Sequence, residues 1–317
     1  MRPHRGSSHN GVAGPSEQPA GSAHPNVQAP ADASRLPMTL PRLLEKKRLG
    51  EPIVMVTAYD FPSARAAEAA GVDLVLVGDS GAMTVLGYPS TVAVELDELL
   101  VLARATRRGL HNPFLVGDLP FGSYEISDEQ AVTTAFRFIK DAGCDAVKLE
   151  GGGPVSAARA RAIVAAGIPV MGHVGLTPQT STALGGYRAQ GRTANAAARI
   201  AREALALVDA GCFALVFEAI PSAVAAEIMP RIEVPVIGIG AGAATDGQVL
   251  VFHDLLGIRE GLGARFVKRY ASLQDEMAAG VAAFAEDVRT RRYPGPEHGY
   301  SIDEAELDAF RAELASG

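Results

Sequence analysis

Residues 73–80 read DLVLVGDS and residues 114–120 read FLVGDLP, and each is an apolar run that ends in an acid. Such runs are typical of parallel strands covered on both faces. Six more segments are strand candidates, although the last is less apolar: IVMVTAYD (53–60), DAVKLEGG (145–152), PVMGHVG (169–175), ALVFEAI (214–220), VPVIGIGAG (234–242) and ARFVKRY (264–270). The sequence therefore predicts eight strands.

Amphipathic segments rich in Ala, Leu, Arg and Glu separate these strands, and several end in a glycine that can close a helix. The expected strand tips, from Asp60 to Lys268, follow one another at intervals of about 30 residues, the size of one βα unit. Eight such units predict an α/β protein with a (β/α)8 TIM barrel over residues 38–292. A doubly wound open sheet is the alternative.

The two ends of the chain differ from this pattern. Residues 1–37 are rich in Gly, Pro, Ser and Ala, and such a segment buries too little surface to offset its ordering entropy, so we expect a disordered tail. The helical segment LPRLLEKKRLG (40–50) could plug the bottom of the barrel. Residues 293–317 are expected to form a linker and a short C-terminal helix.

Composition excludes several classes of protein. The chain of 317 residues has 29 basic and 36 acidic side chains, a net charge of −7, and shows no basic stripe of the kind that binds nucleic acid. No apolar run approaches the roughly 20 residues needed to cross a bilayer. The two cysteines, Cys144 and Cys212, can form neither a disulfide framework nor a metal-binding spacing, so we expect a cytoplasmic protein.

Acidic residues end three consecutive strand candidates: Asp79, Asp118 and Glu150. Consecutive strands are neighbours in a barrel, so three carboxylates would meet at its mouth and repel one another unless protonated or bound to a cation. Oxygen ligands without cysteine favour Mg²⁺, or Mn²⁺, over Zn²⁺. The alternative for each acid alone is a helix cap or a hydrogen bond to a loop amide.

Three other polar residues lie in or at the ends of apolar strands. Lys148 shares a strand face with Glu150 and is suited to bind a substrate carboxylate or neutralise an enolate, unless it forms only a structural salt bridge. Glu218 follows an apolar run, which predicts a general base; the alternative is a helix cap. His173 is a candidate for orienting the substrate, although such a histidine is as often a simple hydrogen-bond partner.

Ordered motifs carry a resemblance to a known family: TAYD (57–60), LVGDS (76–80), MTVLGY (83–88), GDLPFGSY (117–124), VKLEGG (147–152), GHVGLTPQ (172–179), GGYRAQGR (185–192), PVIGIGAG (235–242), TDGQVLVFHD (245–254) and YPGPEH (293–298). In this order and spacing, the chain from about Thr39 to Tyr300 closely resembles the ketopantoate hydroxymethyltransferase family. The tail and the C-terminal helix go beyond the pattern of that family.

The resemblance implies a (β/α)8 barrel that holds one Mg²⁺ per subunit and assembles as a homodecamer. It implies metal ligands at Asp79, Asp118 and Glu150, 2-oxo acid contacts from Asp79, Ser80, Asp118 and Lys148, and Glu218 as the proton acceptor. The co-substrate of the family is 5,10-methylenetetrahydrofolate.

The implied reaction belongs to pantothenate and coenzyme A biosynthesis. It moves a one-carbon unit to 3-methyl-2-oxobutanoate through an enolate stabilised by Mg²⁺ and yields 2-dehydropantoate. Two other readings remain: a carbon–carbon lyase of the phosphoenolpyruvate mutase and isocitrate lyase type, and a barrel that serves only as an oligomeric scaffold. The first often uses a catalytic cysteine, whereas Cys144 and Cys212 precede strands instead of ending them.

Overall fold

Eight parallel strands close into a barrel in chain order, and β8 pairs with β1. The structure, a computed structural model, describes residues 36–183, 185–259 and 263–317, so nearly all of the predicted disordered tail lies outside the described residues. The strands are β1 (Ile53–Thr57), β2 (Leu74–Val77), β3 (Phe114–Asp118), β4 (Ala146–Lys148), β5 (Val170–Gly175), β6 (Ala214–Glu218), β7 (Val236–Ile239) and β8 (Gly247–Leu250). The expected barrel is confirmed, and the open sheet is excluded.

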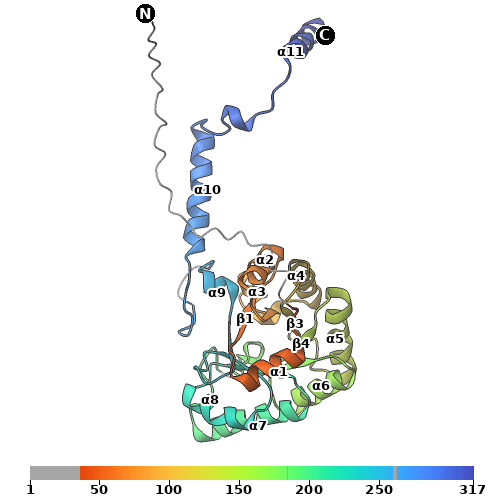
Figure 1. Cartoon of the computed structure of the whole chain (residues 1–317), viewed down its shortest axis with the longest axis vertical. Helices are drawn as coiled ribbons and strands as arrows, with labels where there is room; N and C mark the ends of the chain where they lie inside the picture. The colour runs from red at the N-terminus through yellow and green to blue at the C-terminus, as the bar shows by residue number, and fades with distance from the viewer. Residues whose placement is uncertain (1–35, 184, 260–262) are drawn as a thin grey trace, which may run out of the picture.

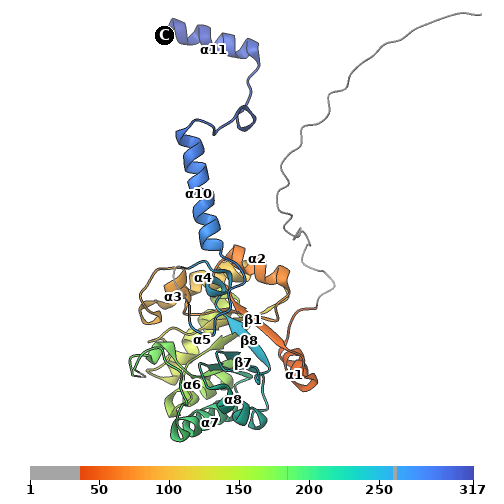
Figure 2. The same cartoon turned by 90° about the vertical axis from the view of Figure 1, so that its left-hand side faces the viewer.

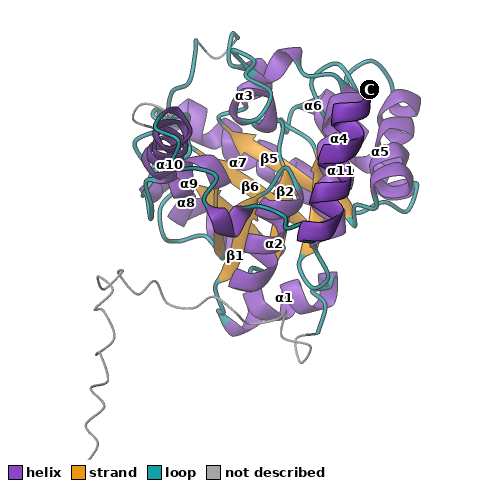
Figure 3. Ribbon diagram, turned by 90° about the horizontal axis from the view of Figure 1, so that it is seen from above, coloured by secondary structure: helices purple, strands orange, loops and turns teal. Residues whose placement is uncertain are grey.

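Helices surround the barrel: in Figure 1, α5 to α8 run from its right side around the bottom to the lower left, and in Figure 3 the strands are enclosed by helices. The helices are α1 (Leu40–Leu49), α2 (Phe61–Ala70), α3 (Gly81–Thr84), α4 (Leu96–Gly109), α5 (Asp128–Ala142), α6 (Pro154–Ala165), α7 (Ala194–Asp209), α8 (Ser222–Ile228), α9 (Phe252–Leu256), α10 (Leu273–Arg289) and α11 (Glu304–Ser316).

Alternate strand residues fill the inside of the barrel with apolar side chains, among them Met55, Val116 and Ile237. Leu43 of α1 belongs to the same cluster and is 1% exposed. The first helix therefore packs against the barrel interior, as its sequence predicted. Because the interior is filled, the space for chemistry lies at the opposite, C-terminal ends of the strands.

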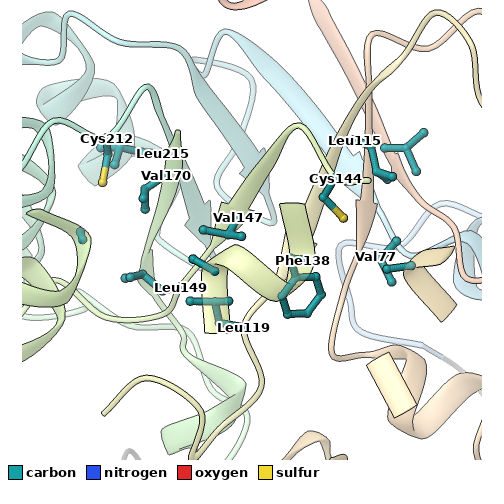
Figure 4. Packing of buried hydrophobic residues seen from close by; sticks show 14 of the residues in the cluster. Val77, Leu115, Leu119, Phe138, Cys144, Val147, Leu149, Val170, Cys212 and Leu215 are labelled. Atoms are coloured by element: carbon teal, nitrogen blue, oxygen red, sulfur yellow. The ribbon is translucent and has the colours of Figure 1, made fainter. Parts of the chain in front are cut away.

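A second apolar layer lies between the strands and the helices (Figure 4). Phe138 of α5 is fully buried there beside strand residues that include Leu115 and Val147. A Cβ at Gly117 would lie 2.3 Å from Cδ1 of Phe138, so only glycine lets α5 pack this closely on β3. This contact fixes the end of β3, where Asp118 follows.

The eighth strand is β8, and the expected assignment of residues 264–270 to it was wrong. The connection from β7 to β8, residues 240–246, contains no helix, so the 30-residue interval fails at this step. A Cβ at Gly247 would lie 2.3 Å from the carbonyl oxygen of Ile53, which shows how closely β8 approaches β1 at the closure. Lys268 instead lies in an irregular segment, where its Nζ is 4.7 Å from the Tyr270 ring centroid.

The two last helices leave the barrel. Figures 1 and 2 both show α10 standing away from the strands, with α11 beyond it. Both helices lie wholly within the described residues, and neither has a buried residue. Among the described residues, no helix combines the length and the apolar character needed to cross a bilayer.

Candidate active site

One cavity of about 900 Å³ opens at the C-terminal ends of the strands. All seven residues singled out in the sequence line it: Asp79, Ser80, Asp118, Lys148, Glu150, His173 and Glu218. They come from β3, β4, β5 and β6 and from the segments that directly follow β2 and β4. The residues that the sequence predicted at strand ends thus lie together in the fold, although up to about 140 positions separate them in the chain.

The floor of the cavity is a hydrogen-bonded group of charged side chains. Asp118 and Lys148 are paired in register on β3 and β4, and Nζ of Lys148 lies 2.7 Å from Oδ1 of Asp118. The same Nζ lies 3.6 Å from Oε1 of Glu150. The backbone N–H of Asp79 donates to Oδ2 of Asp118 over 3.0 Å. This hydrogen bond links the segment after β2 directly to the end of β3.

Burial controls the charge state of this floor. It raises the pKa of Asp79 well above its usual value, and the charges of Asp118 and Glu150 add to the rise. Burial also raises the pKa of Asp118, although Lys148 partly offsets this. For Glu150, burial favours the neutral form, but Lys148 and His173 outweigh it and lower the pKa. Among the described residues Asp79 is in no ion pair, so an added cation would stabilise this carboxylate most.

The donors of the floor fit a hard divalent cation. They are buried carboxylate oxygens with an unfavourable charge balance, and Mg²⁺ is usually held by one or two carboxylates together with waters and substrate oxygens. Within the described residues no group of three or more His, Cys, Asp and Glu side chains is arranged as a metal cluster. Lys148 contacts both Asp118 and Glu150, which leaves Asp79 as the acid of the three without a cationic contact.

His173 connects the acidic floor to Glu218. Its Nδ1 lies 3.4 Å from Oε1 of Glu150, and its Nε2 lies 3.3 Å from Oε2 of Glu218. These are ion-pair contacts; neither nitrogen forms a hydrogen bond of good geometry with the described residues. Burial and Lys148 oppose protonation of the imidazole, but Glu150 and Glu218 outweigh them and raise the pKa of His173 to about 9. The ring is therefore cationic at neutral pH.

The end of β6 that carries Glu218 is held in a strained conformation. The next residue, Ala219, has a φ of 49°, which is unusual for a residue other than glycine. Its N–H donates to the Ile239 carbonyl over 2.8 Å, and its carbonyl accepts from the N–H of Gln190 over 2.9 Å. Strain of this kind often occurs at functional sites. Here it fixes the point at which the chain turns away after Glu218.

The charge on His173 predicts a pH dependence of stability. The folded-state pKa of about 9 lies above the ordinary value of 6.5, so the stabilisation is complete below about pH 6.5 and is lost as the pH rises through 9. We expect the unfolding temperature in a metal-free buffer to fall over this range, and a His173→Asn variant to fall less. Thermal unfolding of both proteins from pH 6 to 9.5 measures this, and equal slopes would contradict it.

Ser80 has a partner that the sequence did not predict. Its Oγ lies 2.8 Å from the hydroxyl of Tyr59, which is a buried side chain. Burial raises the pKa of Tyr59 to about 12, so the phenol keeps its proton. Asp60, the acid next to it, caps α2 by accepting from the N–H of Ser63 over 2.7 Å. Asp60 therefore serves as a helix cap.

Two further residues contact the acids, and sequence reasoning gave them no role. Gln179 lies in the short turn η2 (Pro178–Thr180) after β5, and Tyr124 lies in the loop after β3. The side chain of Gln179 reaches Asp79, and the Tyr124 hydroxyl reaches Gln179. Both stand in motifs quoted above, GHVGLTPQ and GDLPFGSY, but no spacing rule predicts where such loops meet.

Comparison with known proteins decides the family. The family model described as ketopantoate hydroxymethyltransferase matches residues 37–296. The chain belongs to this family. It is 50% identical over 268 residues to the 3-methyl-2-oxobutanoate hydroxymethyltransferase of Moorella thermoacetica, covering 84% of this chain and 99% of that protein. It is also 48% identical over 283 residues to the protein of Arabidopsis thaliana that is named 3-methyl-2-oxobutanoate hydroxymethyltransferase 1, mitochondrial. That match covers 87% of this chain and 82% of the Arabidopsis protein.

Solved structures of other enzymes share the fold. Phosphonopyruvate hydrolase in complex with oxalate and Mg²⁺ superimposes with a TM-score of 0.54 at 14% identity, covering 88% of this chain and 97% of that one. A 2,3-dimethylmalate lyase gives a TM-score of 0.52 at 15% identity, covering 88% and 99%. At such low identity these likenesses concern the barrel alone. Membership of the transferase family favours the transferase reading over the lyase reading.

Proposed function

We propose that this chain transfers a hydroxymethyl group from 5,10-methylenetetrahydrofolate to 3-methyl-2-oxobutanoate and forms 2-dehydropantoate, a step of pantothenate biosynthesis. The observation that carries the proposal is the arrangement of two carboxylate groups across one imidazole. Glu150, with Asp118 and Lys148, lies on one side of His173, and Glu218 lies on the other. Such a site can bind an anionic keto acid and remove a proton from it.

We assign the cation to Asp79, Asp118 and Glu150. Mg²⁺ bound there would act as a Lewis acid toward the keto group and make the C3 proton more acidic. Burial opposes the charged form of Lys148, but the neighbouring acids of the floor outweigh it and raise its pKa, so its ammonium can neutralise the negative charge that the substrate carries and develops. Ser80 and Asp79 lie at the wall of the same cavity, where the 2-oxo acid would contact them.

Glu218 removes the C3 proton in this proposal. C3 then forms a bond to the methylene carbon of the folate, both carbon–nitrogen bonds of that methylene group break, and a water molecule supplies the hydroxyl group. The proton taken from C3 and the second proton of the water end on the two folate nitrogens. His173 contacts the Glu218 carboxylate and orients it toward the substrate. A cavity of about 900 Å³ is at the upper end of what drug-sized ligands occupy, so it has room for a folate beside a small keto acid.

The test is the formation of 2-dehydropantoate from the two proposed substrates, with and without a chelator. We expect product only when Mg²⁺ or Mn²⁺ is present. Calorimetry of Mg²⁺ binding with and without 3-methyl-2-oxobutanoate provides the second readout, and the two ligands should strengthen each other's binding. An active enzyme in excess chelator would overturn the metal assignment, and the absence of both activity and coupled binding would leave the scaffold reading.

We also propose that the chain forms a homo-oligomer, for which the family resemblance suggests a decamer. On α10 the residues Met277, Val281, Phe284 and Val288 form one exposed apolar stripe at helical spacing. An isolated helix of this kind is only marginally stable in water and needs a partner surface. On the barrel, Val54 of β1 is 50% exposed beside β8, and the helix that comes directly after β8, α9, has only five residues. A second copy of α10 suits this uncovered wall.

Removal of α10 and α11 should therefore change the assembly. We expect a chain that ends at residue 271 to sediment as a smaller species than the full chain, because the apolar stripe is lost. Removal of α11 alone, by ending the chain at residue 300, is the control and should matter less, since α11 exposes fewer large apolar side chains, Phe310 and Leu314. Analytical ultracentrifugation measures both, and an unchanged mass for the shorter chain would contradict the role of α10.

We propose a reducing compartment, the cytoplasm, as the place of action. Cys144 and Cys212 are free and buried, and burial raises the pKa of each thiol to about 12, so neither is poised for disulfide exchange. The relatives from Arabidopsis thaliana and Oryza sativa are named as mitochondrial proteins, whereas the bacterial relatives carry no compartment in their names.

A further inference from the structure

Gln179 joins two acids of the floor that come from different strands. Its Nε2 donates to Oδ2 of Asp79 over 3.1 Å, and its backbone N–H donates to Oε2 of Glu150 over 3.0 Å. The residue is 4% exposed and does not line the cavity. It therefore contacts the acids from within the protein and not from the cavity.

The orientation of this side-chain amide is fixed by its other partners. Nε2 also donates to the carbonyl oxygen of Leu119 over 2.9 Å, and a carbonyl can only accept. The amide NH₂ must therefore face Leu119 and Asp79, and the amide oxygen must face the other way. That oxygen lies 2.7 Å from the hydroxyl of Tyr124, which donates to it. Both the NH₂ group and the oxygen of the side-chain amide therefore have hydrogen-bond partners, and these partners define a single orientation of the amide.

Tyr124 supports this arrangement from the loop after β3. Its hydroxyl accepts from the backbone N–H of Glu150 over 3.3 Å while it donates to Gln179. The side chain is 3% exposed and, like that of Gln179, does not line the cavity. The two residues thus link Asp79, Glu150 and the main chain at Leu119 into one buried network. Such a network fixes side-chain positions when all its members are satisfied.

We propose that Gln179, held by Tyr124, is a positioning residue that sets the placement of Asp79 relative to Glu150 and so prepares the floor for a divalent cation and the keto acid. This inference rests on the proposed function, because it assumes a cation at these acids. Neither residue touches the substrate, and both act through the carboxylates. Residues that orient metal ligands in this way typically change metal affinity by about 10- to 100-fold when they are replaced.

The test compares Mg²⁺ and Mn²⁺ binding by calorimetry, without substrates, in the full-length wild type, Gln179→Met and Tyr124→Phe. Methionine fills a similar volume but makes none of the hydrogen bonds, and phenylalanine removes only the hydroxyl. We expect the dissociation constant to rise about 10- to 100-fold for Gln179→Met, and less for Tyr124→Phe. The KM for the keto acid should rise with it, and the KM for the folate should change less.

A structural role alone would give a different pattern. Thr134→Val is the control, because it removes an equally buried hydrogen bond without contact to an acid. This bond runs from Oγ1 of Thr134, on α5, to the carbonyl of Ser123, in the same loop as Tyr124, over 2.6 Å. The control replacement should lower the unfolding temperature and leave cation affinity unchanged. In the double variant of Gln179 and Tyr124, the loss should be smaller than the product of the two single losses.

Three outcomes overturn the inference: cation affinity equal to that of the wild type in Gln179→Met, an equal loss of affinity in Thr134→Val, or losses that multiply in the double variant. If Gln179→Met fails to fold, Tyr124→Phe carries the test alone against Thr134→Val. A wild type that binds neither Mg²⁺ nor Mn²⁺ would instead contradict the proposed function. The failure of the inference and that of the proposed function are thus told apart by the wild-type titration.

Discussion

Replacing Glu218 with glutamine is expected to slow the exchange of the C3 proton of 3-methyl-2-oxobutanoate with solvent by about 10²- to 10⁴-fold, the usual contribution of a general base. Glutamine keeps the size of the side chain but cannot accept the proton. The contact of Oε2 with His173, at 3.3 Å, can persist as a contact with the amide oxygen. Binding of the keto acid and of Mg²⁺ should therefore change little, because both are proposed to use the floor on the other side of the imidazole.

Proton NMR of the keto acid in deuterated buffer, without folate, measures this exchange directly. Omitting the folate separates proton removal from transfer of the one-carbon unit. Glu227→Gln is the matched control, since Glu227 lies exposed on α8, nine residues beyond Glu218. Exchange at the wild-type rate in Glu218→Gln would mean that another group is the base.

The sequence predicted the acids of the site because of a property of parallel barrels. All strands end at the same face, so an acid at the end of each of three consecutive apolar runs must approach its neighbours. The strand register confirms that residues at neighbouring strand ends lie side by side, since Asp118 and Lys148 are paired across β3 and β4. No knowledge of the loops was needed to bring these side chains together.

The same reasoning failed where loops and closure decide the structure. Gln179 reaches Asp79 across 100 positions of sequence through a turn whose path no periodicity describes. The strand β8, with the sequence GQVL, is short and begins with a glycine, so its composition is a weak strand signal. It becomes a strand because the barrel must close against β1, and that requirement is tertiary. The residues 264–270 have the better local pattern but do not reach β1.

Replacing Lys148 with methionine is expected to have two effects of opposite sign on ligand binding and a large effect on stability. Lys148 is 4% exposed, and its ammonium lies 2.7 Å from Oδ1 of Asp118. Removing one partner of a buried ion pair commonly costs about 3–5 kcal/mol of unfolding free energy, because the other charge is left uncompensated. The keto acid should bind more weakly, since the positive charge that we propose to face its carboxylate is gone.

A divalent cation should bind such a variant more tightly, because the floor has lost a positive charge and kept its acids. Added Mg²⁺ should then raise the unfolding temperature of Lys148→Met more than that of the wild type, since a ligand that binds only the folded state stabilises it by mass action. Thermal unfolding with chelator and with Mg²⁺ measures both effects. Lys46→Met is the control: Lys46 pairs with Asp73 at 3.2 Å at the opposite end of the barrel, and its loss should not depend on Mg²⁺. If Mg²⁺ stabilised Lys148→Met no more than it stabilises the wild type, the cation would not lie among these acids, because any charge removed next to it must alter its binding.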